Sequence, residues 1–293
     1  MLQRRLFCLR WGGYEVSRLT TEILRKWHLG VKNAPARVRS KPGASQRFKS
    51  ETGDPERDRR RKSTANRILT ILKGALNMAW REGKIDSDAV WRRVEPFEGA
   101  DSARVRYLTL LEAQRLLQAC DASFAKLVRG ALETGARYGE LCKVLVSDFN
   151  HDSGTLAVRV SKGGKPRHII LTKAGVQFFQ DLTRDRAGSE TLFVKDNGHA
   201  WRASHQAEPT AKANAKAGVH PPINFHGLRH TWASHAVMNG IPLMIVAKNL
   251  GHSDTRMVEK HYGHLAQSYV ANEIREKAPN FASADCVPDG GAM

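Results

Sequence analysis

The stretch TGARYGEL, residues 134–141, ends one helix pattern at Gly135 and opens another directly after it. An arginine at such a junction, here Arg137, can point its side chain into a cleft. Three later segments add polar groups: HGLRH at 226–230, LGH at 250–252 and HY at 261–262. Together they supply two arginines, several histidines and a tyrosine. These are the side chains needed to bind a phosphodiester and attack it with a phenol oxygen.

The composition favours a polyanionic partner. The 293 residues leave room for two domains, each with its own core, and the net charge is +18. Lysine and arginine bind phosphates with release of condensed counterions. Residues 1–106 contain 25 Lys and Arg against 12 Asp and Glu, whereas the remainder contains 22 against 17. We therefore expect the N-terminal third to supply much of the nonspecific affinity for DNA.

The cysteines and the apolar runs indicate the compartment. Four cysteines form neither a Cys-x-x-Cys pair nor a disulfide spacing pattern, as expected of reduced, cytoplasmic thiols. No apolar run approaches the ~18 residues of a membrane span. The apolar stretch within residues 1–10 is too short for a signal peptide. The sequence thus predicts a cytoplasmic protein with no membrane partner.

The sequence pattern of the N-terminal third predicts helices on either side of a charged loop. Thr20 to Trp27 is typical of the start of a helix, with Thr20 as its cap. Residues 33–62 are dense in charge, Pro and Gly, which is typical of a flexible loop. A second helix is predicted over Ser63–Glu82, with its apolar side chains on one stripe.

The sequence pattern of the rest of the chain predicts helices before and after a short run of strands. Thr109 and Glu112 form a capping box before a helix that continues to about Ala119. A further helix is predicted over 124–134. Residues 148–171 alternate like strands joined by a glycine-rich hairpin turn. Helical patterns then continue almost to the end, with breaks at Pro221-Pro222, Asn239-Gly240 and Gly251. The predicted fold class is mostly α with a small antiparallel β-sheet (α+β).

Cleavage of a phosphodiester requires charge stabilisation on the phosphoryl oxygens and a proton for the leaving 5′ oxygen. The planar guanidinium forks of Arg137 and Arg229 suit the first task. His226 and His230 lie four residues apart on one helix face, so a metal pair is a rival interpretation. The absence of a His-Glu-x-x-His arrangement and of a nearby cysteine argues against it.

With the lysine-bearing segment 161–171, the motifs resemble those of the tyrosine recombinases, the family of phage integrases. The resemblance extends from about Leu108 to Ala266. It implies a DNA strand transferase that works in site-specific recombination or integration through a covalent 3′-phosphotyrosyl intermediate. It implies no cofactor and no metal, because exchange of one phosphodiester for another keeps the bond energy.

The resemblance also implies catalytic roles. Tyr262 is the expected nucleophile, and a phenol of pKa ~10 needs a base or strong electrostatic help. Arg137, Arg229 and His252 are expected to bind phosphoryl oxygens. His226 is expected to touch the phosphate and help move protons.

Other residues take supporting roles. Lys162 is the expected general acid, and Lys165, three residues on, is the alternative. Glu140 is expected to orient the cluster, and His230 to hold neighbouring backbone in place. Lys165, Arg167, Arg67 and Lys73 are candidate DNA contacts.

The resemblance sets the domain boundaries and partners. Residues 1–94 are predicted to be a partial helical DNA-binding domain that matches only the later helices usual in the family, with no arm-binding domain before it. The predicted linker is 95–105, the catalytic domain 106–278 and a disordered tail 279–293. The expected partner is double-stranded DNA, bound by a homotetramer on paired sites, with accessory DNA-bending proteins as further candidates. The expected setting is a prophage or mobile element in a bacterial nucleoid.

Two other functions stay open. One is a prophage remnant that binds DNA without productive catalysis, and the other is a type IB topoisomerase. The complete catalytic set favours the recombinase over the first. The Leu-Gly-His motif and the short sequence around Tyr262 argue against the second.

Overall fold

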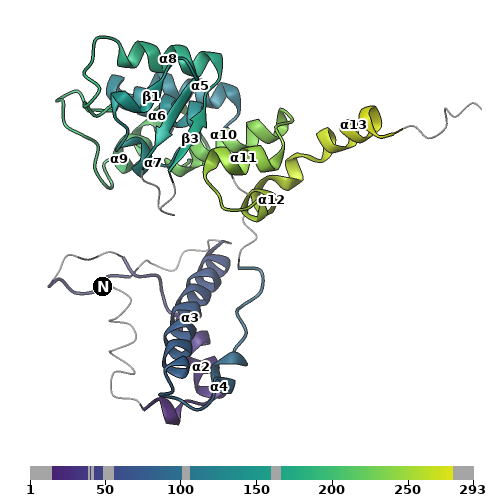
Figure 1. Cartoon of the computed structure of the whole chain (residues 1–293). Helices are drawn as coiled ribbons and strands as arrows, with labels where there is room; N and C mark the ends of the chain where they lie inside the picture. The colour runs from purple at the N-terminus through teal and green to yellow at the C-terminus, as the bar shows by residue number, and fades with distance from the viewer. Residues whose placement is uncertain are drawn as a thin grey trace, which may run out of the picture. The chain divides into compact units, whose positions relative to one another are not determined.

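The computed structural model describes residues 15–38, 40, 43–48, 56–100, 106–159 and 166–279, and Figure 1 draws the chain. The chain divides into two compact units, Met1–Ala103 and Arg104–Met293. Each unit has its own hydrophobic core.

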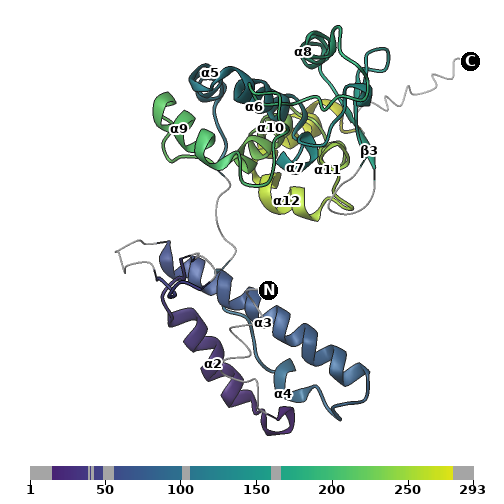
Figure 2. The same cartoon turned by 90° about the vertical axis from the view of Figure 1, so that its left-hand side faces the viewer.

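Helices α2 (Thr21–Asn33) and α3 (Arg57–Arg81) lie side by side in the first unit (Figures 1 and 2). The Thr20 side chain accepts a hydrogen bond from the Ile23 backbone N–H at 3.2 Å, which is the predicted cap. Residues 20–27, predicted to start a helix, open α2, which continues to Asn33. The short helices η1 (Val16–Arg18) and α4 (Ala89–Arg92) flank this pair in the sequence.

The start of α3 corrects the predicted loop. The helix begins at Arg57, so the prediction of a loop through residue 62 was wrong for its last residues. Charged side chains there are paired: Asp58 lies 3.2 Å from Lys62 one turn later and 3.0 Å from Lys32 at the end of α2. Arg61 donates to backbone carbonyls of the same helix end. Ion pairs within and between helices therefore make this charge-rich segment helical.

The predicted linker is also shorter than expected. Two hydrogen bonds of 2.8 Å join the Asn66 side chain to the backbone N–H and C=O of Phe97. The His28 ring stacks on the Phe97 ring with centroids 4.1 Å apart. Residues 95–100 thus pack on the first unit, whereas 101–105 lie outside the described residues. The core of this unit comprises Leu19, Leu24, Trp27, Leu69, Leu72, Leu76, Trp91 and Val94.

The second unit opens with predicted features. The Thr109–Glu112 capping box begins α5 (Leu110–Ala119). Helix α6 (Ala122–Thr134) ends at Gly135, whose φ of 63° is left-handed, and α7 (Tyr138–Leu141) follows at once. After η2 (Val146–Asp148) come three antiparallel strands in the order β1-β2-β3: β1 (Phe149–Asn150), β2 (Thr155–Val158) and β3 (Arg167–Ile170).

Helices make up most of the remaining described chain: α8 (Lys173–Thr183), α9 (Ala207–Ala217), α10 (His226–Met238), α11 (Leu243–Leu250), α12 (Arg256–Tyr262), η3 (Gly263–Leu265) and α13 (Gln267–Lys277). The α+β prediction is confirmed. The expectation of near-continuous helix was wrong for residues 184–206, all described, where turns and the isolated bridges Leu145–Thr191 and Val194–Ala200 occur. The predicted disordered tail is 279–293, and all of it after Pro279 lies outside the described residues.

The core of the second unit has two clusters. The larger includes Leu127 of α6, Leu156 and Ile169 of the paired strands β2 and β3, and Phe179 of α8. The smaller joins α10, α11 and α12 and includes the Tyr262 ring. Helix α10 packs against α6 as well as against α11 and α12 (Figure 2). Residues on α10 therefore lie where the two clusters meet.

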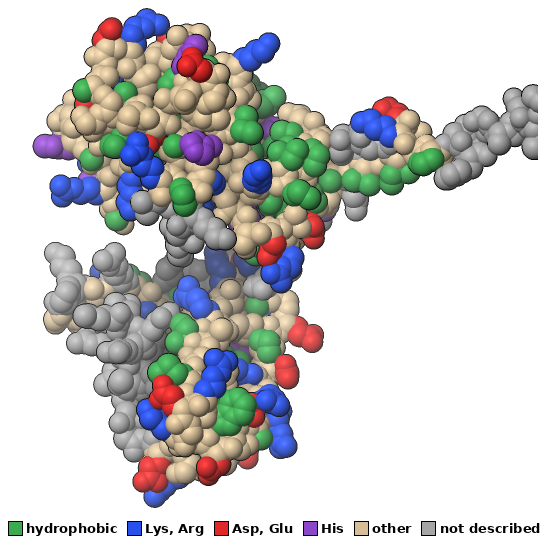
Figure 3. All heavy atoms as spheres, in the orientation of Figure 1, with side chains coloured by type: hydrophobic (Ala, Val, Ile, Leu, Met, Phe, Trp, Pro, Cys, Tyr) green, Lys and Arg blue, Asp and Glu red, His purple; other side chains and the backbone are tan. Residues whose placement is uncertain are grey.

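The surface is mixed in character. On the face in Figure 3, lysine and arginine side chains are interspersed with acidic and apolar ones. Within the part of the chain that the structure describes, no helix combines the length and apolarity needed to cross a membrane.

Candidate active site

Glu140 is the carboxylate of a buried ion-pair network. It occupies the first turn of α7, where its side chain accepts from the Arg137 backbone N–H at 2.9 Å and from the Arg137 guanidinium at 2.8 Å. The Arg167 guanidinium donates to both carboxylate oxygens, at 2.8 and 3.2 Å. Burial opposes ionisation, but the hydrogen bonds from Arg167 and Arg137 outweigh it and hold the pKa of Glu140 at about 2. An ionised Glu140 therefore fixes two arginines.

Arg167 connects the sheet to the end of α11. Its Nε donates to the Asn249 carbonyl at 3.0 Å, and the Asn249 side chain accepts from the Ile170 N–H of the same strand at 3.0 Å. We predicted that Arg167 contacts DNA, but its side chain is only 10% exposed. The structure places it inside the unit, because the buried Glu140 carboxylate offers a bidentate partner that matches the guanidinium fork.

The Leu-Gly-His turn after α11 lies between two arginines. Gly251 has a left-handed φ of 74°, and a Cβ at this position would come within 2.9 Å of the Arg167 side chain. The backbone conformation and this close approach both require glycine. On the other side, Arg229 Nη2 donates to the Leu250 carbonyl at 2.8 Å and lies 3.1 Å from His252 Nε2.

Arg229 is held by the ends of two helices. Besides the Leu250 carbonyl of α11, it contacts the Gly135 carbonyl after α6, at 2.9 Å from Nη1. Carbonyls at helix C-termini carry partial negative charge, so they suit a cation. Burial, and then the charge of Arg137, lower the pKa of Arg229 to about 10. Arg229 therefore stays protonated at neutral pH, with its guanidinium plane fixed.

The nearby imidazoles are neutral in this arrangement. Burial, followed by the charges of Arg229 and Arg137, lowers the pKa of His252 to about 4. The same causes lower the pKa of His226, the first residue of α10. Positive charge is thus already concentrated here, and an anion between these groups would relieve the repulsion.

Tyr262 ends α12 with its ring in the smaller core cluster and is 4% exposed. Its hydroxyl lies 2.5 Å from His230 Nδ1. Burial raises the pKa of Tyr262 to about 12, although Arg229 acts in the opposite direction. We expected His230 to hold neighbouring backbone. In the structure its Nδ1 instead contacts the phenol, because the packing of α10 against α12 brings the two side chains together.

These groups offer fixed cations, neutral imidazoles and a phenol on neighbouring elements of one unit. Residues 106–268, more than half of the chain, match the phage integrase family. The chain belongs to the phage integrase family. The resemblance seen in the motifs is confirmed, and with it the enzyme class of the tyrosine-type recombinases.

Curated members of the family align with much of the chain. Tyrosine recombinase XerA of Saccharolobus solfataricus is 25% identical over 272 residues, which cover 92% of this chain and 82% of the relative. Tyrosine recombinase XerC of Xanthomonas campestris is 33% identical over 178 residues, 57% of this chain and 55% of the relative. The integrase of Salmonella phage P22 is 26% identical over 229 residues, 71% and 55%. The chain spans about half the length of the last two.

Solved integrase structures share the fold. The Tn1549 transposon integrase in complex with transposon right end DNA superposes with a TM-score of 0.68 at 18% identity, covering 95% of this chain and 92% of that chain. A lambda integrase dimer bound to a core site gives a TM-score of 0.59 at 19% identity, covering 82% and 81%.

Two predicted site residues of this integrase-family chain belong to the first unit, and two others are not described by the structure. Lys162 and Lys165 fall outside the described residues. Arg67 and Lys73 lie on α3 of the first unit, where Arg67 is exposed and Lys73 donates to the Arg92 carbonyl at 3.4 Å. Their roles in acid catalysis or DNA contact stay predictions.

Sequence reasoning missed Asn249, which joins β3 to the integrase Leu-Gly-His turn. It is buried, at 9% exposure, in the last turn of the apolar helix α11. A polar residue within an apolar run was the available signal, because buried polar groups normally have hydrogen-bond partners.

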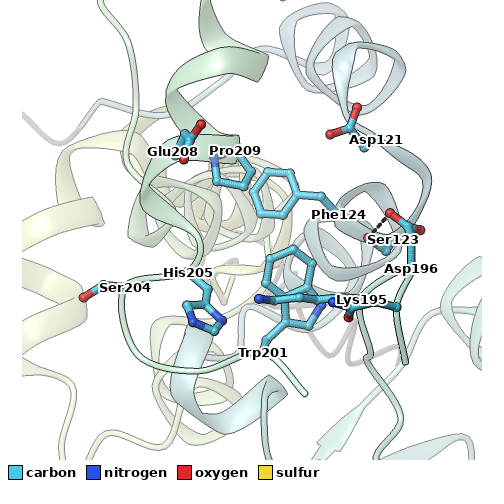
Figure 4. Close-up of a pocket in the computed structure, with 11 residues that line it drawn as sticks. Asp121, Ser123, Phe124, Lys195, Asp196, Trp201, Ser204, His205, Glu208 and Pro209 are labelled. Atoms are coloured by element: carbon cyan, nitrogen blue, oxygen red, sulfur yellow. Dashed lines mark hydrogen bonds between the residues drawn. The ribbon is translucent and has the colours of Figure 1, made fainter. Parts of the chain in front are cut away.

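A cavity of about 550 Å³ is lined by the start of α6, residues 195–205 and the start of α9 (Figure 4). The Trp201 and Phe124 rings lie 5.6 Å apart, and Lys195 Nζ is 5.4 Å from the Trp201 ring centre. Ser123 donates to Asp196 at 3.0 Å. Of the predicted catalytic residues that the structure describes, none lines this cavity, so the reaction is not assigned to it.

Proposed function

We propose that this chain cleaves double-stranded DNA at specific sites, holds the cut end as a 3′-phosphotyrosyl link to Tyr262, and joins it to another strand. The observation that carries the proposal is the Tyr262 hydroxyl, which contacts His230 and lies close enough to Arg229 for that cation to favour the phenolate. Attack by the hydroxyl forms the oxygen–phosphorus bond and releases a 5′-hydroxyl. A 5′-hydroxyl of another strand then reverses the step.

The arginines suit stabilisation of the transition state. Arg229 is fixed by the Gly135 and Leu250 carbonyls, so its remaining N–H groups keep one direction without reorganising. The Arg137 side chain, bound to Glu140, is still 29% exposed, which leaves it accessible to a phosphate. Loss of one donor to a developing oxyanion typically costs about 10²–10³ in rate.

The leaving 5′ oxygen needs a proton. Resemblance to the family assigns this role to Lys162, with Lys165 as the alternative. His226 and His252, beside the cationic cluster, gain basicity when an anionic ester binds, because its charge offsets that of the arginines. Both are suited to contact phosphoryl oxygens.

The reaction needs no external energy source in this scheme. Each step exchanges one phosphodiester for another, so the work lies in positioning and charge stabilisation. Cleavage is therefore expected in excess EDTA.

Double-stranded DNA is the proposed partner. The lambda and Tn1549 integrases that share the fold were solved bound to DNA, and this chain carries a net charge of +18. Paired sites and exchange between two duplexes imply a homotetramer, and DNA-bending proteins are candidate accessories. Integration or excision of a mobile element is the proposed outcome.

A suicide substrate tests the proposal. A nicked duplex from the sequence flanking the gene loses a short strand on cleavage, so the covalent adduct accumulates and appears on a denaturing gel. The wild-type chain should form adduct in EDTA. Tyr262→Phe keeps the ring but not the hydroxyl, so it should bind DNA and form none.

Three outcomes decide between the functions. Wild-type adduct levels in Tyr262→Phe would refute the nucleophile. DNA binding without adduct from the wild type would favour an unproductive DNA-binding remnant. Efficient relaxation of a supercoiled plasmid that lacks recombination sites would favour a topoisomerase.

A further inference from the structure

The contact at the Tyr262 hydroxyl comes from an unexpected histidine. His230 Nδ1 lies 2.5 Å from the phenol oxygen, and the two rings have centroids 5.9 Å apart. Resemblance to the family directs attention to His226 for proton movement. In the structure the His226 ring meets the His230 ring edge to face at 4.8 Å, one turn earlier on α10. His230 therefore has an imidazole nitrogen within hydrogen-bonding distance of the phenol oxygen of Tyr262.

The surroundings determine which partner holds the proton. His226 and Arg229 face His230 from α10, and His261, whose ring lies 6.2 Å away, faces it from α12. Burial, and then these neighbours, lower the pKa of His230 to about 4. The resting pair is thus a neutral imidazole and a neutral phenol. In the tautomer with the imidazole proton on Nε2, the phenol donates its hydrogen to Nδ1 and keeps its oxygen lone pairs for attack.

We infer that His230 holds the Tyr262 hydroxyl in the attacking orientation and takes its proton as the phenol oxygen bonds to phosphorus. This inference rests on the proposed function. In the step, the Oη–H bond breaks and the proton moves to Nδ1. The Oη–P bond forms, the P–O5′ bond breaks, and the 5′ oxygen receives a proton from the general acid. Religation runs the same transfers backward, so His230 returns its proton to the phenol.

A weak base can act here because bound substrate changes the charge around it. An imidazole crowded by cations is a poor base in the free enzyme. A phosphodiester bound beside Arg229 brings negative charge into the cluster and raises the basicity of nearby imidazoles. Proton acceptance by His230 is therefore favoured when substrate is present, which limits futile ionisation of the phenol.

The variant His230→Asn distinguishes orientation of the Tyr262 hydroxyl by a hydrogen bond from acceptance of its proton. The asparagine amide can accept a hydrogen bond near the position of Nδ1, but it does not take a proton at neutral pH. We expect single-turnover adduct formation to fall by about 10²–10⁴, the usual contribution of a general base, with DNA binding retained. His235→Asn is the matched control. His235 lies on the same helix, contacts the Leu108 carbonyl at 2.8 Å, and its substitution should leave adduct formation near wild type.

The dependence of the adduct-formation rate on pH distinguishes proton transfer from a structural role, because loss of a purely structural contact would not change its slope. Without the base, attack requires phenolate, so the rate of His230→Asn should rise about tenfold per pH unit between pH 7 and 9. The wild-type profile should be flatter. His226, His261 and Arg229 are common to both proteins, so the difference in slope reports His230. A substrate with 5′-bridging sulfur, which needs little leaving-group protonation, should not rescue the variant.

Each result has one meaning. Wild-type rates in His230→Asn, or parallel pH profiles, would overturn the inference while the adduct itself upholds the proposed function. Rescue by the sulfur substrate would overturn it too, by placing the defect at the leaving group. Absence of adduct from the wild type would overturn both. If thermal unfolding shows that His230→Asn does not fold, His230→Gln is judged by the same pH slope.

Discussion

Removal of the Glu140 charge should destabilise the second unit by a predictable amount. Glu140→Gln keeps the size of the side chain but leaves Arg137 and Arg167 without their shared carboxylate. A pKa of about 2, against an ordinary 4.5, corresponds to about 3 kcal/mol, at about 1.4 kcal/mol per tenfold change. Loss of one partner of a buried ion pair typically costs about 3–5 kcal/mol, which agrees.

The pH dependence gives the sign of the effect. The folded-state pKa of Glu140 is depressed, so its contribution is complete above the unfolded pKa and is lost as pH falls through the folded pKa. The difference in free energy of unfolding between wild type and Glu140→Gln should be full above pH ~5. It should fall below half by pH ~3 and vanish only below pH ~2.

Urea unfolding from pH 3 to 7, followed by fluorescence, measures this difference. Glu133→Gln is the control, because the pair of Glu133 with Arg129 is partly exposed and such pairs contribute less than about 1 kcal/mol. A difference below 1 kcal/mol at pH 7, or one that grows as pH falls, would refute the view that an ionised Glu140 anchors the cluster.

Three further outcomes are expected. Arg229→Lys should lose about 10² or more in adduct formation, because one ammonium group cannot reproduce the guanidinium fork that spans two helix ends; near-wild-type cleavage would remove Arg229 from the reaction. Gly251→Ala should lower the free energy of unfolding by roughly 1–2 kcal/mol from left-handed strain alone, and an unchanged urea midpoint would contradict both this strain and the close approach to Arg167. Arg67→Ala should flatten the slope of log K against log salt in DNA-binding anisotropy by about 0.9 if this exposed side chain neutralises one phosphate, whereas an identical slope would exclude that contact.

Local features were predictable because their causes are local. The Thr20 cap and the Thr109–Glu112 capping box involve residues three apart in the sequence. The left-handed Gly135 that ends α6 is equally a matter of backbone conformation. The motifs identified the family for a similar reason, since the type and order of side chains are properties of the sequence itself.

The high density of charge led to a wrong prediction of a loop where long-range contacts between charged side chains and a neighbouring helix decide the structure. The sequence segment before residue 63 has the composition of a loop, but Asp58 and Arg61 meet the end of α2 and stabilise a helix start. In the same way Asn66 binds the backbone of Phe97, 31 residues later, and draws part of the expected linker into the first unit.

The sequence by itself determined the uneven distribution of charge, the helix ends that caps and glycines mark, and the set of arginines, histidines and tyrosine. It did not determine which of these side chains meet. Arg167 lies 27 residues from Glu140, and His230 lies 32 residues from Tyr262. These partners are set by the tertiary structure, which brings Arg167 of β3 to Glu140 of α7 and packs α10 against α12. A hydrogen bond forms only between atoms about 3 Å apart, and residue type alone does not tell which residues come that close.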